Sequence, residues 1–330
     1  MGVYEDDKKW EDIVPIPQDE GGPNPLAAIA YTDEYSEAMS YLRAVMAKNE
    51  MSERALGLTE DIIAMNPAHY TVWLYRAQIL KTLKKDPQEE LTWLNAVALK
   101  HLKNYQIWHH RQIITSLLPT LPPTELPFLT RMLAKDVKNY HVWSYRQWLV
   151  KHFGLWDAEY NYIEGMLRSD VRNNSAWNHR WYVTFGRYEG VTEGEGEKEP
   201  SKEVYEREIG YAKVAIREAP QNPSPWNYLK GVLRKQGGGS GSIKEFALEF
   251  VDLDKEGGEG EGEGEGEDVR SSHALDFLAE IWAEEKQRAR AEKALELLSR
   301  KYDPIRRNYW EYRRSLLEVE AVPRLQDLEL

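Results

Sequence analysis

The sequence predicts an all-α protein built from stacked helical hairpins, and three observations carry this prediction. A short motif of tryptophan and arginine returns at a nearly constant spacing along the chain. The segments between its copies carry apolar residues at the three- and four-residue spacing of helices. Alternation of the kind typical of strands is almost absent. We therefore expect a right-handed α–α superhelix, a crescent-shaped solenoid of about six to seven helical hairpins.

The motif is clearest in two stretches, KNYQIWHHR at residues 103–111 and KNYHVWSYR at residues 138–146. Six in-frame copies place tryptophans at Trp73, Trp108, Trp143, Trp177, Trp226 and Trp310. The first three gaps are 35, 35 and 34 residues, and the two longer gaps each contain a tract of glutamate and glycine. Because a solenoid accepts extra sequence at its loops, an insertion leaves the repeat intact on either side.

Each repeat divides into two predicted helices. Residues 90–103 and 107–118 both carry apolar residues at helical spacing, and Asn104 between them is suited to cap the second helix. Asn139 recurs at the same point, and either Asn173 or Asn174 follows it. The tryptophan and the arginine three residues later share one helix face. We expect the tryptophan to fill the seam between hairpins and the arginine to bond carbonyls or carboxylates of the neighbouring repeat.

The expected domain organisation is an extended N-terminal segment at residues 1–25 followed by the superhelix at residues 26–330. Flexible insertions are expected near residues 189–200, 236–242 and 256–268, where glycine is frequent. None of these glycine-rich stretches contains the lysine of a phosphate-binding loop.

Composition excludes several kinds of site. The chain has no cysteine, hence no disulfide, thiolate metal ligand or cysteine nucleophile. His109 and His110 are adjacent, so their side chains diverge on a helix and no metal site is expected there. The net charge is −12, but residues 189–200 carry −4 and residues 256–268 carry −7. The remainder is near neutral and does not indicate nucleic-acid binding. No apolar run approaches the ~20 residues of a membrane span, and a cytoplasmic protein is expected.

The arginine separates this repeat from a similar one. A tetratricopeptide repeat has nearly the same period but places leucine three residues after tryptophan, whereas arginine follows in five of the six copies here. Asn-Tyr-x-x-Trp-x-x-Arg instead resembles the prenyltransferase alpha-subunit repeat. Residues 10–32 and 302–313 resemble the entry segment and the closing repeat of that family. Within it, the chain is most similar to the branch shared by protein farnesyltransferase and geranylgeranyltransferase type I.

This resemblance implies a heterodimeric enzyme. In the family, the alpha subunit wraps around an obligate beta subunit. The heterodimer transfers farnesyl or geranylgeranyl from its diphosphate to the cysteine of a C-terminal Cys-a-a-X (CaaX) motif, in substrates such as Ras- and Rho-type GTPases. The resemblance also implies zinc held by the beta subunit, and magnesium for farnesyl transfer. It leaves open which isoprenoid is transferred, because the beta subunit sets isoprenoid length.

Lys103 is the candidate catalytic residue. It stands at the start of a predicted helix, where free N–H groups and the helix dipole favour an anion and an ammonium group adds to the attraction. Pyrophosphate leaves during prenyl transfer, so a cation placed there helps most in the transition state. In the family, the lysine of the KNYQ repeat reaches the isoprenoid diphosphate, and it matches Lys103. Lys138 shares the local motif, but the resemblance gives it no equivalent role.

The resemblance also assigns substrate binding to six residues: Tyr70, Tyr105, Gln106, Asn139, Tyr140 and His141. Tyr105 lines the cleft, either as a wall or as a late hydrogen-bond donor to diphosphate. Gln106 meets the terminal carboxylate of the substrate peptide through its amide N–H groups. The third-repeat residues match positions near the isoprenoid and its diphosphate. His69 precedes Tyr70 where the other repeats carry asparagine, so the cap at that helix is changed.

The alternative is a non-catalytic helical-repeat scaffold, similar to tetratricopeptide proteins, that binds peptides on its concave face. It explains the recurrence of tryptophan and arginine equally well. It leaves unexplained why Lys-Asn-Tyr is confined to two adjacent repeats and why both end segments match. Co-expression with a farnesyltransferase beta subunit separates the two hypotheses, because only an obligate partner co-purifies and prenylates a CaaX peptide.

Overall fold

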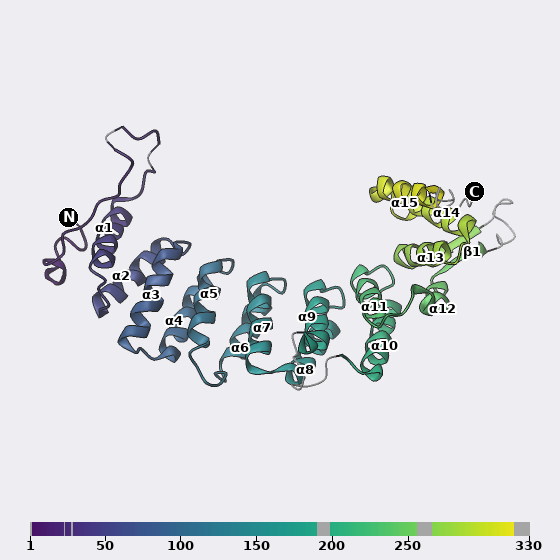
Figure 1. Cartoon of the computed structure of the whole chain (residues 1–330), viewed down its shortest axis with the longest axis horizontal. Helices are drawn as coiled ribbons and strands as arrows, with labels where there is room; N and C mark the ends of the chain where they lie inside the picture. The colour runs from purple at the N-terminus through teal and green to yellow at the C-terminus, as the bar shows by residue number, and fades with distance from the viewer. Residues whose placement is uncertain (1, 23, 28, 190–198, 256–265, 320–330) are drawn as a thin grey trace, which may run out of the picture. The chain divides into compact units, whose positions relative to one another are not determined.

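The computed structural model describes residues 2–22, 24–27, 29–189, 199–255 and 266–319, and within them it is helical apart from one short pair of strands. The chain divides into two compact units, Met1–Leu155 and Trp156–Leu330. Within each unit, helices that are adjacent in sequence pair as hairpins, as Figure 1 shows. The predicted fold class, an all-α solenoid of helical hairpins, is confirmed within each unit.

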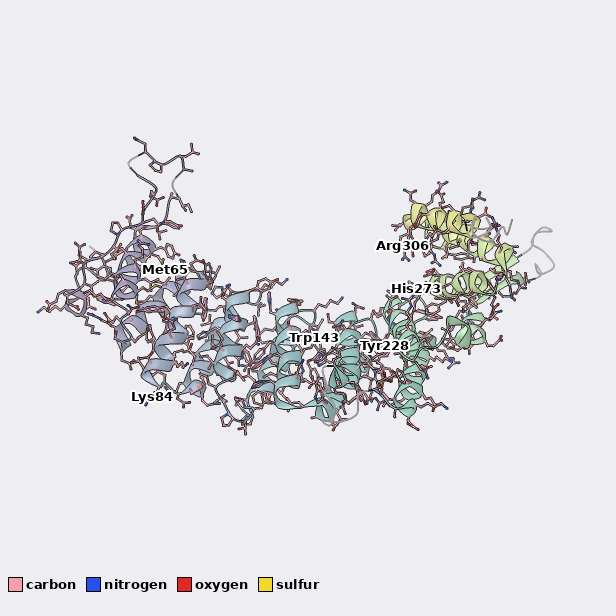
Figure 2. All side chains as sticks on the ribbon, in the orientation of Figure 1. Met65, Lys84, Trp143, Tyr228, His273 and Arg306 are labelled. Carbon is pink, nitrogen blue, oxygen red and sulfur yellow. The ribbon has the colours of Figure 1, made fainter. Side chains whose placement is uncertain are left out.

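The first unit contains three complete hairpins preceded by one helix. Its described helices are α1 (Asp33–Ala47), α2 (Glu53–Met65), α3 (Tyr70–Leu83), α4 (Pro87–Lys100), α5 (Tyr105–Thr115), α6 (Glu125–Lys135) and α7 (Tyr140–Phe153). Helices α2–α3, α4–α5 and α6–α7 form the hairpins, and α5 contacts both α3 and α7. Met65 and Lys84 lie at opposite ends of the α2–α3 hairpin (Figure 2). We call the Met65 end, where α3, α5 and α7 each begin with a tyrosine, the tyrosine edge.

The second unit continues the same arrangement. Its described helices are α8 (Trp156–Ser169), α9 (Asn174–Phe185), α10 (Lys202–Glu218), α11 (Pro223–Lys235), α12 (Lys244–Leu248), α13 (Ser272–Glu284), α14 (Arg288–Leu297) and α15 (Arg307–Val319). They pair in order, so the described residues form seven hairpins, in agreement with the predicted six to seven. The long tryptophan gap before Trp310 contains a whole hairpin, α12–α13. In α13, buried Leu275 takes the place of the motif tryptophan, so this hairpin carries no copy of the motif.

The pair of strands was not predicted. Strand β1 (Val251–Lys255) pairs antiparallel with β2 (Gly266–Val269), and Lys255 stands opposite Gly266. In β1, buried Val251 and Leu253 alternate with two exposed aspartates, a period-two pattern too short to stand out in the sequence.

Two of the predicted insertions overlap described secondary structure. The insertion predicted at 256–268 overlaps β2 at residues 266–268, and residues 256–265 lie outside the described residues. The insertion predicted at 236–242 runs into a 3₁₀ helix at Ser240–Ile243. Most of the insertion predicted near 189–200 also lies outside the described residues, since the structure describes nothing between residues 189 and 199.

The N-terminal segment is docked on the first two helices and is not simply extended. Lys8–Trp10 form a 3₁₀ helix, and Trp10 is buried. The Glu37 carboxylate in α1 accepts hydrogen bonds from the backbone N–H groups of residues 3–5, at 2.9–3.1 Å. Arg54 in α2 forms a bidentate pair with Asp12, at 2.6 and 2.8 Å. The chain before α1 is thus an integral part of the first unit.

The motif tryptophans are buried, as predicted, and most also donate a hydrogen bond. The indole N–H groups of Trp143, Trp177 and Trp226 donate to the carbonyl six residues earlier, at 2.8–2.9 Å. The asparagine that caps the second helix of the following hairpin can donate to this same carbonyl. Asn222 Nδ2 bonds the Val171 oxygen at 2.8 Å, so that one carbonyl joins two repeats. A single backbone oxygen therefore holds both the tryptophan and the following hairpin in place.

Three motif arginines bond carboxylates of the following hairpin, which confirms the prediction for these copies. Three bidentate pairs form between buried side chains: Arg76–Glu90, Arg111–Glu125 and Arg180–Glu208, with distances of 2.6–3.0 Å. A residue on the second helix of the glutamate's own hairpin completes each cluster: His110, Tyr145 or Tyr228, at 2.6–2.8 Å. Each glutamate thereby links three helices. No sequence signal separates these buried glutamates from the rest, because α4 and α10 also carry exposed glutamates.

Candidate functional site

Three exposed tyrosines mark the tyrosine edge. Tyr70, Tyr105 and Tyr140 are 63%, 66% and 67% exposed, and each is the first residue of its helix. Their side chains project from the ends of the hairpins, while the tryptophans three residues later are buried. Large aromatic side chains gathered at one exposed edge are typical of a binding surface.

Asparagine caps fix where two of these helices begin. Asn104 Oδ1 accepts from the backbone N–H groups of Gln106 and Ile107, at 2.8 and 3.2 Å, as predicted. Asn139 Oδ1 accepts in the same way from the first turn of α7. His69 precedes α3 and makes no side-chain cap bond, so the substitution noticed in the sequence does remove a cap.

Asn139 also ties two repeats together beside Lys103. Its side chain is only 2% exposed, and Nδ2 donates to the Leu102 carbonyl at 2.8 Å. Leu102 immediately precedes Lys103, so the start of α7 holds the loop that carries the lysine. The structure accounts for Asn139 as a cap and a tether, and direct contact of this side chain with a substrate stays a prediction.

Lys103 is exposed and pairs with no acidic side chain among the described residues. Lys138 is also exposed, but its loop is closed differently. The Lys138 backbone N–H bonds the Asp136 carboxylate at 3.2 Å, whereas His101 occupies the corresponding place before Lys103. The two lysines share a sequence motif, yet their loops are built from different contacts.

An aromatic cluster joins the second and third repeats. The Tyr105 and His141 rings meet edge to face, with centroids 4.2 Å apart, and the Tyr140 ring lies 5.6 Å from His141. Burial lowers the pKa of His141, so its imidazole is neutral near pH 7. A neutral imidazole can donate one hydrogen bond and accept another at this surface.

The structure brings most of the predicted site residues together. Tyr105, Tyr140 and His141 form the ring cluster, Asn139 holds the Lys103 loop, and half-buried Gln106 follows Tyr105 in α5. Tyr70 stands apart: its ring contact is with His69, at 6.3 Å. Exposed ammonium, hydroxyl and imidazole groups beside aromatic walls can bind an anion that carries an apolar chain.

The described residues offer no obvious metal centre. No group of three or more histidine, aspartate or glutamate side chains converges among them. His109 is exposed and His110 is buried against Glu90, which bears out the expected divergence of their side chains. None of the helices that the structure describes has the length and apolarity needed to cross a bilayer.

Comparison with known proteins identifies the repeat. The family profile named "Protein prenyltransferase alpha subunit repeat" matches residues 52–83, 87–118, 122–153, 156–185 and 205–236. These ranges correspond to the five hairpins from α2–α3 to α10–α11. The matches thus begin and end where the structure begins and ends its hairpins.

Relatives of the whole chain carry one name. "Protein farnesyltransferase/geranylgeranyltransferase type-1 subunit alpha" of Candida albicans is 38% identical over 317 residues, covering 93% of this chain and 97% of that protein. The protein of the same name from Dictyostelium discoideum is 34% identical, covering 92% and 91%. Among solved structures, "Candida albicans protein geranylgeranyltransferase-I complexed with GGPP" matches with a TM-score of 0.81 and 37% identity. That match covers 94% of this chain and all of the other.

Proposed function

The chain belongs to the protein prenyltransferase alpha-subunit family, and from this membership we propose that it is the alpha subunit of a protein farnesyltransferase/geranylgeranyltransferase type I. The observation that carries the proposal is similarity to proteins of that name over more than nine-tenths of both chains. The peptide-binding scaffold does not account for this full-length similarity. The solved neighbour, described as complexed with GGPP, supports an isoprenoid diphosphate as a substrate.

The active enzyme is a heterodimer with a beta subunit. The tyrosine edge supports this assignment, because it exposes aromatic side chains and an unpaired lysine that need a second surface to exclude water. The chain has no cysteine, and its described residues bring no three metal ligands together. As the family resemblance implies, zinc is held by the beta subunit, and farnesyl transfer uses magnesium.

Lys103 stabilises the leaving group in this reaction. The sulfur of the substrate cysteine forms a bond to the first carbon of the isoprenoid as the carbon–oxygen bond to diphosphate breaks, and the electron pair leaves with pyrophosphate. Zinc supplies stabilisation of the cysteine thiolate. The Lys103 ammonium and the N-terminal dipole of α5 offset the charge that grows on the departing oxygen.

The remaining site residues bind the two substrates. Tyr105 and the imidazole of His141 form one wall for the isoprenoid, and Tyr140, whose ring contacts His141, borders the isoprenoid and its diphosphate. Gln106 binds the terminal carboxylate of the CaaX peptide, and Tyr70 extends the cleft. CaaX proteins such as Ras- and Rho-type GTPases are the substrate class.

Co-expression with each candidate beta subunit tests the proposal. We expect the chain to co-purify with a farnesyltransferase or geranylgeranyltransferase type I beta subunit, and the complexes to prenylate CaaX peptides with farnesyl or geranylgeranyl diphosphate. The chain alone should show no turnover and hold no stoichiometric zinc. One tightly bound zinc per isolated chain, or turnover without a partner, contradicts the heterodimer. Failure both to co-purify and to prenylate favours the scaffold.

A further inference from the structure

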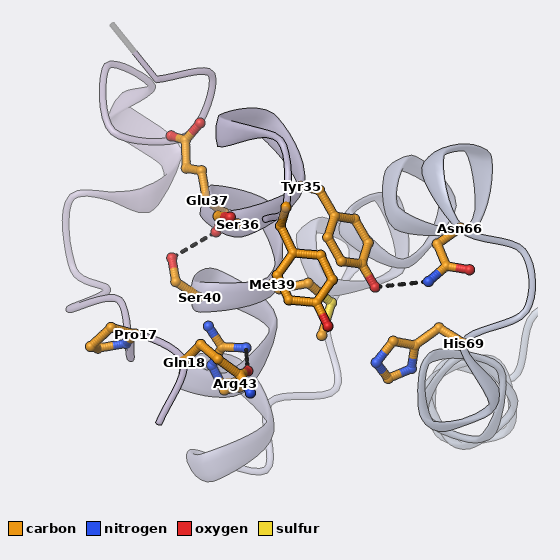
Figure 3. Close-up of a pocket in the computed structure, with 11 residues that line it drawn as sticks. Pro17, Gln18, Tyr35, Ser36, Glu37, Met39, Ser40, Arg43, Asn66 and His69 are labelled. Atoms are coloured by element: carbon orange, nitrogen blue, oxygen red, sulfur yellow. Dashed lines mark hydrogen bonds between the residues drawn. The ribbon is translucent and has the colours of Figure 1, made fainter. Parts of the chain in front are cut away.

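A cavity of about 440 Å³ lies in the first unit, between the N-terminal segment, α1 and the loop that joins α2 to α3 (Figure 3). Its volume is within the range of small-molecule sites, about 300–1,000 Å³. Six of the side chains that line it are Gln18, Tyr31, Tyr35, Met39, Arg43 and His69. None of them has a part in the proposed transfer reaction.

Arg43 places a positive charge in this cavity without a counterion. Its Nε donates to the Ile16 carbonyl at 2.7 Å and its Nη1 to the Gln18 side-chain oxygen at 3.1 Å, and both acceptors are neutral. No carboxylate among the described residues pairs with it. Glu37 also lines the cavity, but its oxygens accept from the backbone of residues 3–5.

The contrast with the paired arginines shows what is missing at Arg43. Burial lowers the pKa of Arg43. Burial acts in the same direction on Arg180, but the hydrogen bond and charge of Glu208 outweigh it and raise the pKa of Arg180. A partly buried guanidinium with only neutral partners is a strong attractor for an anion, and its planar donors suit a carboxylate.

The other walls are suited to an apolar body. Figure 3 shows the His69 ring across the cavity from Arg43. Tyr31 and Tyr35 pack with ring centroids 5.2 Å apart, and Met39 adds a polarisable thioether.

We propose that this cavity binds a carboxylate attached to a flat apolar body. Arg43 pairs with the carboxylate, the two tyrosine rings and Met39 pack on the body, and the His69 ring closes the far end. Two sources have this chemistry: a free aromatic carboxylic acid, and the C-terminus of a peptide that ends in an aromatic residue.

Calorimetric titration tests the proposal on the full-length chain purified with its beta subunit. The probes are N-acetylphenylalanine, its amide, and the peptide N-acetyl-Gly-Gly-Phe. We expect the acid to bind with one site per chain and the amide, which lacks the negative charge, to bind at least about tenfold more weakly. Tighter binding of the peptide identifies a peptide C-terminus as the source, and equal binding identifies a free carboxylic acid. No isoprenoid is present, so no transfer occurs, and variants of the cavity separate this binding from the carboxylate binding proposed for Gln106.

Matched variants assign the binding to this cavity. Arg43→Gln keeps a side chain that can bond Gln18 but removes the charge, and should weaken acid binding about tenfold or more. His69→Asn restores the residue found at this place in other repeats, keeps the fold and should weaken binding about fivefold. Arg131→Gln, at an exposed position in α6, should change nothing. Equal affinity for acid and amide, absence of saturable binding, or unchanged binding in both cavity variants overturns the proposal.

Discussion

Lys103 and Lys138 show how identical local sequence can lead to different surroundings. Both follow a first helix, and both precede an asparagine cap and an exposed tyrosine. Lys138 lies in a loop closed by Asp136, while the Lys103 loop is held through the Leu102 carbonyl by the next repeat. This tether sets Lys103 near the contact between Tyr105 and His141.

Replacement of Lys103 by alanine should slow the chemical step. A charge-assisted contact with the leaving diphosphate is worth roughly 1.5–3 kcal/mol. If this free energy stabilises only the transition state, its loss corresponds to about a 10- to 150-fold fall in the rate of the chemical step. Single-turnover prenylation by the heterodimer measures it, and titration with isoprenoid diphosphate should show a much smaller loss of binding. Lys138→Ala is the control, and equal rates for the two variants contradict the role of Lys103.

Asn139→Ala should reduce both stability and the rate of transfer. Loss of the cap alone costs about 1 kcal/mol. Release of the Leu102 carbonyl also frees the Lys103 loop, and we expect about a tenfold fall in the single-turnover rate because the lysine is no longer positioned. Asn222 caps α11 and bonds the Val171 carbonyl with the same 2.8 Å geometry, far along the chain from Lys103. Asn222→Ala should therefore lower the melting temperature similarly and leave the rate unchanged. A matching loss of rate in both variants would reduce Asn139 to a purely structural residue.

At the scale of the helices, buried glutamates join successive hairpins. Burial opposes ionisation of Glu90, but hydrogen bonds from His110 and Arg76 outweigh it, so the pKa of Glu90 is lowered. Burial also lowers the pKa of His110, and Glu90 only partly opposes this. The cluster near pH 7 is thus a charged arginine and glutamate beside a neutral histidine. Loss of one partner from such a buried pair leaves an uncompensated charge, which is why these clusters fix how the hairpins stack.

The neutral state of His110 makes folding stability depend on pH. Below about pH 6.5 the unfolded chain binds a proton that folded His110 does not bind, so stability falls as the pH drops from 7 toward 5. His110→Tyr places at this position the residue that serves Glu125 and Glu208 in other repeats. We expect it to reduce the loss of unfolding free energy between pH 7 and pH 5 by about 1–2 kcal/mol. Urea denaturation across this range measures it, with His109→Gln as the exposed neighbour control. Identical pH dependence in the wild type and His110→Tyr rules out the histidine as the source.

At the scale of the whole molecule, most of the net negative charge lies outside the helical hairpins. Most of the net charge of −12 belongs to two tracts of glutamate and glycine, and the remainder is near neutral. Strands β1 and β2 bring the two ends of the second tract together at Lys255 and Gly266. A short turn could therefore join β1 to β2 in place of the intervening residues.

Replacement of residues 256–265 by Asn-Gly should leave the enzyme intact. Antiparallel strands accept a two-residue turn, and Asn-Gly is the favoured sequence for it. Since a run of alternating glutamate and glycine is too polar to bury, we expect heterodimer assembly and turnover within about twofold of the wild type. Size-exclusion chromatography with the beta subunit and steady-state prenylation measure the two properties. Loss of assembly would identify the tract as part of the subunit interface.

The sequence alone determined the repeating unit. Helical periodicity, the asparagine caps and the Trp-x-x-Arg spacing act over a few residues, so a linear pattern records them directly. The hairpins and the burial of tryptophan and arginine could be predicted for that reason. The α12–α13 hairpin was not predicted because Leu275 replaces the motif tryptophan. Strand β1 was not predicted because its alternation of apolar and polar residues is only a few residues long.

Only the tertiary structure decided which residues meet. Glu90 lies 14 residues from Arg76, and Leu102 lies 37 residues from Asn139, so their contacts depend on how one hairpin stacks on the next. The Arg43 cavity likewise needs the N-terminal segment to fold back on α1 and on the loop before α3. Such pairings cannot be read from a periodic pattern. A hydrogen bond between two hairpins depends on one particular partner at one particular place, and the spacing of residues along the sequence does not record it. The physical reason is that helix geometry is local, whereas the satisfaction of buried charges and polar groups is a property of the packed molecule.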